Sequence, residues 1–307
     1  MNTWTLHHSD CLDAMRAMPN DSVDSVVTDP PYGISFQGKN WDHGVPGKAF
    51  WEEALRVAKP GAHLVAFGGT RTYHRLACAI EDAGWEIRDS CMWLFGVGFP
   101  KSLDVGKALQ KAGNDPNKWE GWGTALKPGY EPIILARKPF NTTVVDNVLT
   151  HGTGAINVGA CRVGDEVLPE IAAGQAKIGT FERNDMVTPE RVGRYPANVL
   201  LDEEAAKLVD EESKVEASRF FYCAKTSSKE RGSNNHPTVK PLSLMKWLTK
   251  LVTPAGGLVL DPFAGSGTTL VAALEEGFNA VGVEREAEYV EIIRGRLSQF
   301  TELKCAT

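Results

Sequence analysis

Residues 28–33, TDPPYG, combine a carboxylate with two prolines and a tyrosine. The β-branched run at 23–27 before them predicts a buried strand, so Asp29 falls where open α/β sheets bind ligands, at a strand's carboxyl end. The prolines remove backbone donors and leave carbonyls free to accept hydrogen bonds, and Tyr32 offers a flat face. The stretch predicts a site that accepts protons and stacks on a planar group, although an ordinary Pro-Pro turn capped by Asp29 is the alternative.

A second stretch, DPFAGSGTT at 261–269, lies between an apolar run at 257–260 and an apolar-periodic run at 270–274. This order predicts a strand, a glycine turn and a helix. The glycines allow a ligand close to the backbone, and the start of the helix presents its amides and positive dipole end. Because no Lys follows the glycines, a phosphate loop is disfavoured, and Asp261 suits a positively charged cofactor better than a pyrophosphate.

A further strand is predicted at 279–283 and ends at Glu284. An acid at the end of such a strand can accept hydrogen bonds from both ribose hydroxyls of an adenosine-type cofactor. The adenosine cofactor that carries a positive charge is S-adenosyl-L-methionine. The sequence therefore predicts this cofactor.

Together, DPFAGSGTT and TDPPYG resemble the amino-methyltransferases of DNA, which methylate an exocyclic base nitrogen. The catalytic-type motif comes first, as in the circularly permuted β class of that family. NNHPTVKP at 234–241 resembles the upstream cofactor segment of that class. GFPKSLDVGKAL at 98–109 and LKPGYEPIILARKP at 126–139 resemble phage and prophage members. The resemblance covers most of the chain outside about 140–230.

The motifs and the resemblance give each site residue an expected role. The catalytic residues are Asp29, Pro30, Pro31 and Tyr32. The cofactor-binding residues are Asp10, Cys11, Asp29, His236, Thr238, Lys240, Asp261, Pro262, Phe263, Ala264, Gly265, Ser266, Gly267, Thr268, Glu284 and Arg285. In the permuted order the opening strand is the third, so Asp10 is expected near the adenine of the cofactor.

The chemistry of methyl transfer explains the catalytic motif. The exocyclic amine of adenine is a weak nucleophile because its lone pair is delocalised into the ring. Hydrogen bonds from its N–H groups to the Asp29 carboxylate and the Pro30 carbonyl would localise that lone pair. A carboxylate is too weak a base to deprotonate the amine beforehand, but it can take the proton once the methylated nitrogen becomes acidic. A paired base cannot reach such a site, so we expect base flipping, with Tyr32 stacked on the flipped base.

Adenine N6 is the expected target. Cytosine N4 is the alternative, because both bases present an amine beside a ring nitrogen, although Ser commonly stands at the position of Asp29 in cytosine enzymes. RNA or protein-amide methyltransferases more often have Asn there. A catalytically inactive DNA-binding regulator would need the glycine turn but not the DPPY set.

Length and composition fit one catalytic domain with an embedded region: 307 residues, 42% of them hydrophobic. With no long apolar run and no signal-like start, we expect no membrane contact and a cytoplasmic protein of a bacterial host, on the nucleoid when bound to DNA. The six cysteines form no C-x-x-C pair, so no metal site is expected. A net charge of −6 argues weakly against DNA, but basic residues cluster locally and predict a basic cleft on an acidic protein.

Hydrophobic periodicity predicts an α/β fold with seven strands, and the resemblance implies that they form the Rossmann-like methyltransferase sheet, circularly permuted. Strands are expected at 4–8, 23–28, 63–67, 85–95, 131–137, 257–261 and 279–283, and helices at 12–18, 50–57, 71–83 and 242–252. We expect a catalytic half at 1–139, an inserted target-recognition region at 140–235 and a cofactor-binding half at 236–307. A lid or dimer contact is the alternative for the insertion. The expected partner is double-stranded DNA, and the resemblance allows a homodimer.

Overall fold

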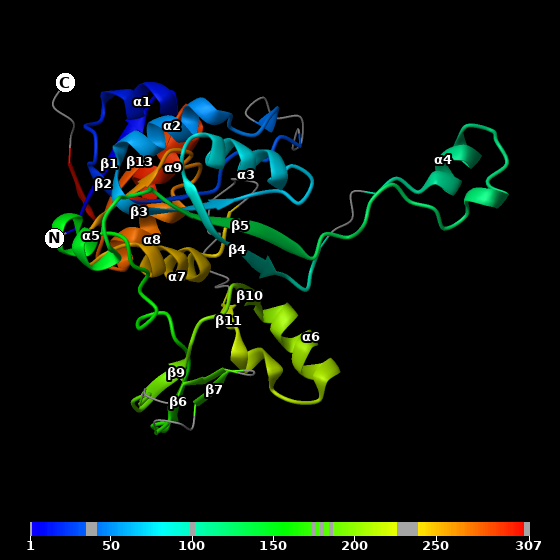
Figure 1. Ribbon diagram of the computed structural model, residues 1–307. Helices are drawn as coiled ribbons and strands as arrows, with labels where there is room; N and C mark the ends of the chain where they lie inside the picture. The colour runs from blue at the N-terminus through cyan, green and yellow to red at the C-terminus, as the bar shows by residue number, and fades with distance from the viewer. Residues whose placement is uncertain are drawn as a thin grey trace.

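The computed structural model describes residues 2–34, 42–98, 102–172, 176–178, 181–183, 187–225 and 239–303. Its main element is a ten-stranded sheet in the order β11-β10-β4-β5-β3-β2-β12-β13-β1-β14 (Figure 1). The strands are β1 (Thr3–His8), β2 (Val23–Thr28), β3 (Ala58–Phe67), β4 (Glu86–Leu94), β5 (Tyr130–Arg137), β10 (Val199–Asp202), β11 (Tyr222–Ala224), β12 (Leu258–Asp261), β13 (Asn279–Glu284) and β14 (Thr301–Glu302).

The seven predicted strands form the middle of this sheet, from β4 to β1. In this stretch β5 runs antiparallel to β3 and β4, and the other neighbours pair in parallel. The prediction of the methyltransferase-like α/β sheet is confirmed, but the sheet is wider than seven strands because β10, β11 and β14 extend its edges. These strands have two to four residues each, too few for a periodic pattern to indicate them.

Helices cover both faces of the sheet, and the alternation of side chains in the strands separates two cores (Figure 1). In β2, Val26 packs in a core with Trp51, and the next residue, Val27, packs in a second core with Leu244 and Leu270. The first core lies under α1 (Cys11–Ala17), α2 (Lys48–Val57) and α3 (Tyr73–Asp82). The second lies under α7 (Leu242–Val252), α8 (Thr268–Glu275) and α9 (Ala287–Leu297).

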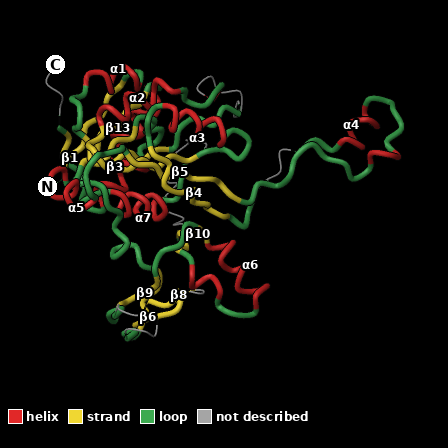
Figure 2. Tube along the Cα trace, in the orientation of Figure 1, coloured by secondary structure: helices red, strands yellow, loops and turns green. Residues whose placement is uncertain are grey.

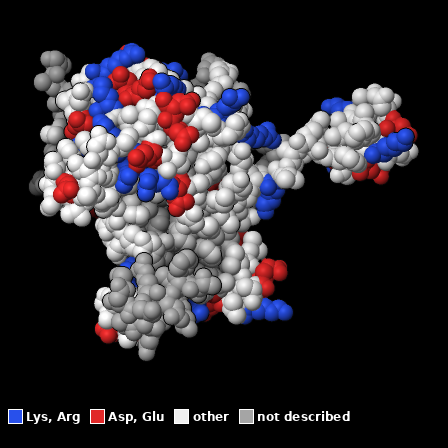
Figure 3. Space-filling view, viewed as in Figure 1, with Lys and Arg blue, Asp and Glu red and all other residues white. Residues whose placement is uncertain are grey.

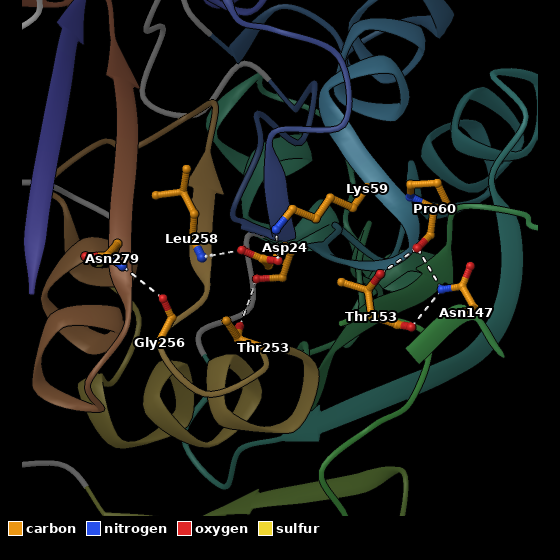
Figure 4. Close-up of polar contacts among 10 residues, drawn as sticks. Asp24, Lys59, Pro60, Asn147, Thr153, Thr253, Gly256, Leu258 and Asn279 are labelled. Carbon is orange, nitrogen blue, oxygen red and sulfur yellow. Dashed lines mark hydrogen bonds and ion pairs between the residues drawn. The ribbon is translucent and has the colours of Figure 1, made fainter. Parts of the chain in front are cut away.

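Side-chain contacts join the two halves of the chain at the end of the sheet where β2 and β12 begin (Figure 4). The Asp24 carboxylate accepts hydrogen bonds from Lys59 Nζ at 2.5 Å and from the backbone N–H of Leu258 at 2.8 Å. Ser25 Oγ lies 2.8 Å from Thr253 Oγ1. These bonds fix β12 against β2, so the opposite ends of both strands are held side by side.

The boundary between α2 and β3 differs from the sequence prediction. The predicted helix at 50–57 and the predicted strand at 63–67 leave residues 58–62 between them, but β3 begins at Ala58, directly after α2. A register shift against β2 accommodates this early start. Pro60 has no N–H to donate to a ladder, and its carbonyl accepts hydrogen bonds from Asn147 Nδ2 at 2.9 Å and Thr153 Oγ1 at 2.5 Å (Figure 4).

The described parts of 140–235 divide between the main sheet and a smaller lobe below it (Figure 1). The segment α5 (Val144–His151) packs against β3, and β10 pairs with β4. The lobe contains the pairs β6 (Val163–Leu168) with β9 (Arg191–Arg194) and β7 (Ala176–Ile178) with β8 (Phe181–Arg183). Next to β10 and β11 lie α6 (Glu203–Ser213) and η4 (Ala217–Phe220). The boundaries at 140 and 235 stay a prediction.

The connection between β4 and β5 is an arm that stands clear of the body (Figure 2). It carries α4 (Val105–Lys111) and η3 (Asn117–Trp119). Asp104 caps α4 and pairs with Gly123, which closes the arm on itself. The arm leaves the sheet at the edge that holds the carboxyl ends of the parallel strands, because β4 ends there and β5 begins there.

Two further expectations concern the distribution of charge on the surface and contact with a membrane. On the face in Figure 3, acidic and basic side chains are interspersed over the upper body and the tip of the arm. Within the described ranges, each helix is too short or too polar to cross a membrane.

Candidate active site

A cavity of about 340 Å³ lies at the carboxyl ends of the central strands. Among the predicted site residues, its lining includes Asp10, Cys11, Asp29, Pro30, Pro31, Tyr32, Lys240, Asp261, Pro262, Phe263, Ala264, Gly265, Ser266, Thr268, Glu284 and Arg285. Gly267 caps α8 behind this lining. His236 and Thr238 lie outside the described residues. The two motifs, far apart in the sequence, therefore share one cavity.

Asp261 lines this cavity and connects the two motifs. The carboxylate is buried, and its Oδ1 accepts hydrogen bonds from Thr28 Oγ1 at 2.6 Å and from the N–H of Phe263 at 3.1 Å. Burial raises the pKa of Asp261 to about 6, although the hydrogen bonds to the carboxylate oppose the shift. Because Thr28 immediately precedes Asp29, this contact sets the catalytic motif against the cofactor-type turn.

The turn at 265–267 needs its glycines. Both Gly265 and Gly267 have a positive φ, 54° and 77°, and a Cβ on Gly267 would lie 3.0 Å from the side chain of Ile293. The N–H of Gly265 donates to Glu284 Oε2 and the N–H of Glu286 donates to Oε1, each at 2.8 Å. The glycine turn and the end of β13 are thereby held together, and burial raises the pKa of Glu284.

Lys240 forms an ion pair at the catalytic motif. Its Nζ lies 2.6 Å from Asp29 Oδ2 and 3.3 Å from Glu131 Oε2, and the Lys240 side chain is only 7% exposed. The ammonium also lies over the ring of Phe67, 4.9 Å from its centroid. Burial acts to lower the pKa of Lys240, but the two carboxylates outweigh it and raise the pKa above its usual value. The structure places this predicted cofactor residue against the carboxylate of Asp29, the predicted catalytic acid.

The Tyr32 hydroxyl joins the same cluster. It lies 2.9 Å from Asp29 Oδ1 and 2.9 Å from Glu131 Oε2, and its one proton can be donated to either. Burial, with the neighbouring charges of Asp29 and Glu131, raises the pKa of Tyr32 well above its ordinary value. The carbonyl of Tyr32 accepts a 2.6 Å hydrogen bond from Thr72 Oγ1, which fixes the backbone of the motif.

Two acids of this site received no role from sequence reasoning. Glu131 is the second residue of β5 and lines the site from a segment that the sequence identifies as a strand and as part of the family resemblance, without a role for this acid. Asp42 accepts hydrogen bonds from the N–H groups of Gly33 and Ile34, at 2.7 and 3.2 Å, and holds the chain that leaves the catalytic motif. Neither acid stands at a position that a periodic pattern marks as functional, so pattern analysis could not have identified either contact. Residues 35–41, between Ile34 and Asp42, lie outside the described ranges.

The cavity fits an adenosine that carries a positive charge. Its lining includes the acids Asp10, Asp29, Asp261, Glu284 and Glu286. It also includes backbone of the glycine turn at the start of α8 and aromatic side chains such as Phe263 and Tyr289. Its volume lies within the range of small-molecule sites. In the described part of the chain, no group of three or more potential ligands could hold a metal ion.

Comparison with known proteins places this site in a family. The sequence profile of the N6/N4 DNA methylases matches residues 23–295. The type II methyltransferase M.HindIII of Haemophilus influenzae is 25% identical, over 95% of this chain and 94% of that protein. The DNA adenine methyltransferase YhdJ of Escherichia coli K12 is 24% identical, over 95% of this chain and 82% of that protein.

Solved structures show the same fold. The complex of M1.HpyAVI with S-adenosylmethionine has a TM-score of 0.52 and 18% identity, covering 96% of this chain and 99% of that one. The cytosine-N4-specific PvuII DNA methyltransferase has a TM-score of 0.54 and 16% identity, covering 96% of this chain and 86% of that one. With the profile matching most of its length, the chain belongs to the N6/N4 DNA methylase family and is an S-adenosylmethionine-dependent DNA methyltransferase.

Proposed function

We propose that the protein transfers the methyl group of S-adenosylmethionine to the exocyclic N6 amine of adenine in double-stranded DNA. The observation that carries this proposal is the shared cavity, in which Asp29 and Pro30 lie beside the turn at 261–268. The adenine preference is supported by the carboxylate at position 29 and by similarity to YhdJ, which is named as a DNA adenine methyltransferase.

Each residue has a physical task in this reaction. When bound, the cofactor supplies an electrophilic methyl group on a sulfonium. The Asp29 carboxylate and the Pro30 carbonyl accept the two N–H groups of the target amine and direct its lone pair. Lys240 and Tyr32 already bond to Asp29, but each carboxylate oxygen has a second lone pair for the amine. Their hydrogen bonds orient the Asp29 carboxylate before the base arrives.

The cofactor is held by the other half of the site. Glu284 accepts the ribose hydroxyls, and the turn at Gly265 lets the cofactor approach the backbone. The buried negative charge of Asp261 favours the positively charged end of the cofactor. Asp10 lies at the start of α1 and lines the same cavity, where it would lie near the adenine of the cofactor.

The target base reaches this site by leaving the duplex. A cavity at the strand ends cannot be reached by a stacked base, and the ring of Tyr32 provides a stacking surface in return. Residues 140–235 recognise the surrounding sequence, and the lobe with β6 and β9 supplies part of this region. The resemblance to the β class, whose members are often dimers, supports a homodimer as the assembly.

The product identifies the reaction. Duplex DNA incubated with the protein and S-adenosylmethionine is digested to nucleosides and analysed by mass spectrometry, with N6-methyladenine as the expected product. Asp29→Asn serves as the inactive comparison and Asp21→Asn, at the surface, as the matched control. If N4-methylcytosine is the main product, the target base is cytosine instead of adenine, and the mechanism is unchanged. 5-Methylcytosine would contradict the mechanism, because attack by carbon needs a covalent nucleophile.

A further inference from the structure

Glu131 is an acid of the site for which the proposed reaction has no task. Its carboxylate lies within hydrogen-bonding reach of the Tyr32 hydroxyl, 2.9 Å away, and pairs with Lys240 at 3.3 Å. It lies at the start of β5, beside the base of the arm, and its side chain is 25% exposed. Asp29, on the other side of the hydroxyl, is 20% exposed.

The Tyr32 hydroxyl bridges these two carboxylates. Asp29 Oδ1, the Tyr32 oxygen and Glu131 Oε2 form a continuous row with 2.9 Å at each step. Both distances are those of ordinary O–H···O hydrogen bonds. A proton that arrives on Asp29 therefore has a hydrogen-bonded route to Glu131.

The charge of Lys240 gives this route a direction. Its Nζ is closer to Asp29, at 2.6 Å, than to Glu131, at 3.3 Å. A nearby positive charge favours the ionised form of a carboxylate, and more strongly at the shorter distance. The attraction of the Lys240 ammonium for a negative charge is therefore stronger at Asp29 Oδ2 than at Glu131 Oε2.

We propose that Glu131 acts through Tyr32 as a relay residue that receives the proton Asp29 takes from the target amine. The inference rests on the proposed transfer to an exocyclic amine, whether of adenine or of cytosine. After methylation, one N–H bond of the cationic amine breaks, its electron pair stays on nitrogen, and the proton passes to Asp29. Asp29 then gives a proton to the Tyr32 oxygen while the Tyr32 O–H proton passes to Glu131. Asp29 is again a carboxylate, and Glu131 releases its proton to water.

Tyr32 remains a neutral phenol throughout this transfer. The two carboxylates and burial hold its pKa well above the ordinary value, so tyrosinate does not accumulate. The two proton movements at the Tyr32 oxygen must therefore be coupled. The relay therefore requires the hydroxyl of Tyr32 and not its aromatic ring. Mutation can separate the role of the hydroxyl in the relay from the role of the ring in stacking.

Three variants test the relay. Tyr32→Phe keeps the ring and removes the hydroxyl, Glu131→Gln keeps the shape and removes the proton acceptor, and the third variant combines both. Glu275→Gln is the matched control, because Glu275 pairs with Lys246 on α7, away from the cavity. Steady-state methylation is measured from pH 6 to 9, in steps of about one pH unit.

Each single substitution is expected to slow steady-state turnover near neutral pH by about 10-fold or more, because Asp29 must lose its proton before it can act in the next cycle. The double variant should be no slower than the slower single variant, because both changes interrupt one path. The deficit should shrink as pH rises, since water and hydroxide can then take the proton from Asp29. The Michaelis constant for DNA should change little.

Two measurements on the free protein exclude a merely structural effect. Affinity for S-adenosylmethionine by calorimetry should be unchanged in both single variants. In alkaline titrations followed by tyrosinate absorbance, with Tyr32→Phe subtracted, Tyr32 should ionise at lower pH in Glu131→Gln, because a neighbouring negative charge is gone.

A wild-type rate in Glu131→Gln, losses that multiply in the double variant, or an effect confined to the Michaelis constant would overturn the relay. If Glu131→Gln does not fold, Glu131→Asp, which retains a shorter acceptor, takes its place and should lie between wild type and Tyr32→Phe in rate. Failure of the wild-type protein to methylate an amine would instead overturn the proposed function, so the two outcomes are distinct.

Discussion

The side chain of Thr28 donates a 2.6 Å hydrogen bond to the buried carboxylate of Asp261. Thr28 is the last residue of β2 and Asp261 the last residue of β12, so the contact joins the strands that deliver the two halves of the site. The catalytic motif and the cofactor turn are therefore positioned by one shared interaction as well as by the sheet.

Thr28→Val should weaken the positioning of the catalytic motif and of the cofactor turn together. The substitution keeps the branched shape but leaves a buried carboxylate short of a donor, which costs about 1.5–3 kcal/mol for a hydrogen bond to a charged group. We expect a lower free energy of unfolding in urea and weaker binding of S-adenosylmethionine by calorimetry. Thr28→Ser retains the hydroxyl and is the control. Equal stability of the Val and Ser variants would show that the contact contributes little.

Asp29→Ala should remove methyl transfer and leave cofactor binding largely intact. The amine loses its acceptor, and acid–base contributions of this kind are worth about 10²–10⁴-fold in rate. Lys240 retains Glu131 as a partner at 3.3 Å, so the variant does not bury an unpaired ammonium. Transfer of labelled methyl to DNA measures the first effect and calorimetry the second. Turnover at the wild-type rate would contradict the assignment of Asp29.

Gly265→Val should damage the cofactor turn. Gly265 has φ 54°, which a β-branched residue adopts only with strain, and its N–H holds Glu284 Oε2 at 2.8 Å. We expect weaker binding of S-adenosylmethionine with the fold retained by circular dichroism. Gly277→Val is the control for strain alone, because Gly277 also has a positive φ but lies outside the cavity lining, with open space around it. Unchanged cofactor affinity in a folded Gly265→Val protein would argue against the close approach.

Sequence patterns predict the parts of this fold that depend on long periodic runs. The strand ending at Thr28 and the helix at 242–252 have clear patterns and appear where they were expected. The contacts of Lys240 are different, because they join residues 211 positions apart and depend on how the sheet brings its strand ends together. The resemblance assigned Lys240 to the cofactor with the rest of its motif, and only the folded arrangement places it on Asp29.

Glu131 illustrates the same limit from the other direction. It stands among apolar residues at the start of β5, where a sequence pattern gives an acid no task. Its function depends on the hydroxyl of Tyr32 from the far side of β3, and no local spacing encodes that meeting. The short strands β10 and β11 escape prediction for a related reason, since they are strands because β10 pairs with β4 and β11 pairs with β10, not because of their own pattern.

Asp261 should make the stability of the protein depend on pH. Its pKa is about 6 in the folded protein and lies near 3.8 when the side chain is exposed. Between these values the folded state holds a proton that the unfolded state has released, so the stabilising effect is complete below about pH 4 and is lost as pH rises through 6. The shift corresponds to about 3 kcal/mol by order of magnitude.

Asp261→Asn isolates this effect, because Asn Oδ1 can still accept from Thr28 and Phe263 while its side chain carries no charge. His63 complicates the wild-type curve on its own, since burial lowers its pKa to about 4 and gives stability that is lost as pH falls through that value. The difference between the variant and wild type removes the His63 contribution. We expect the free energy of unfolding of Asp261→Asn, relative to wild type, to rise by about 2 kcal/mol from pH 4 to pH 7 in urea titrations. A difference that does not change over this range would mean that Asp261 is not held in a protonation-sensitive, buried state.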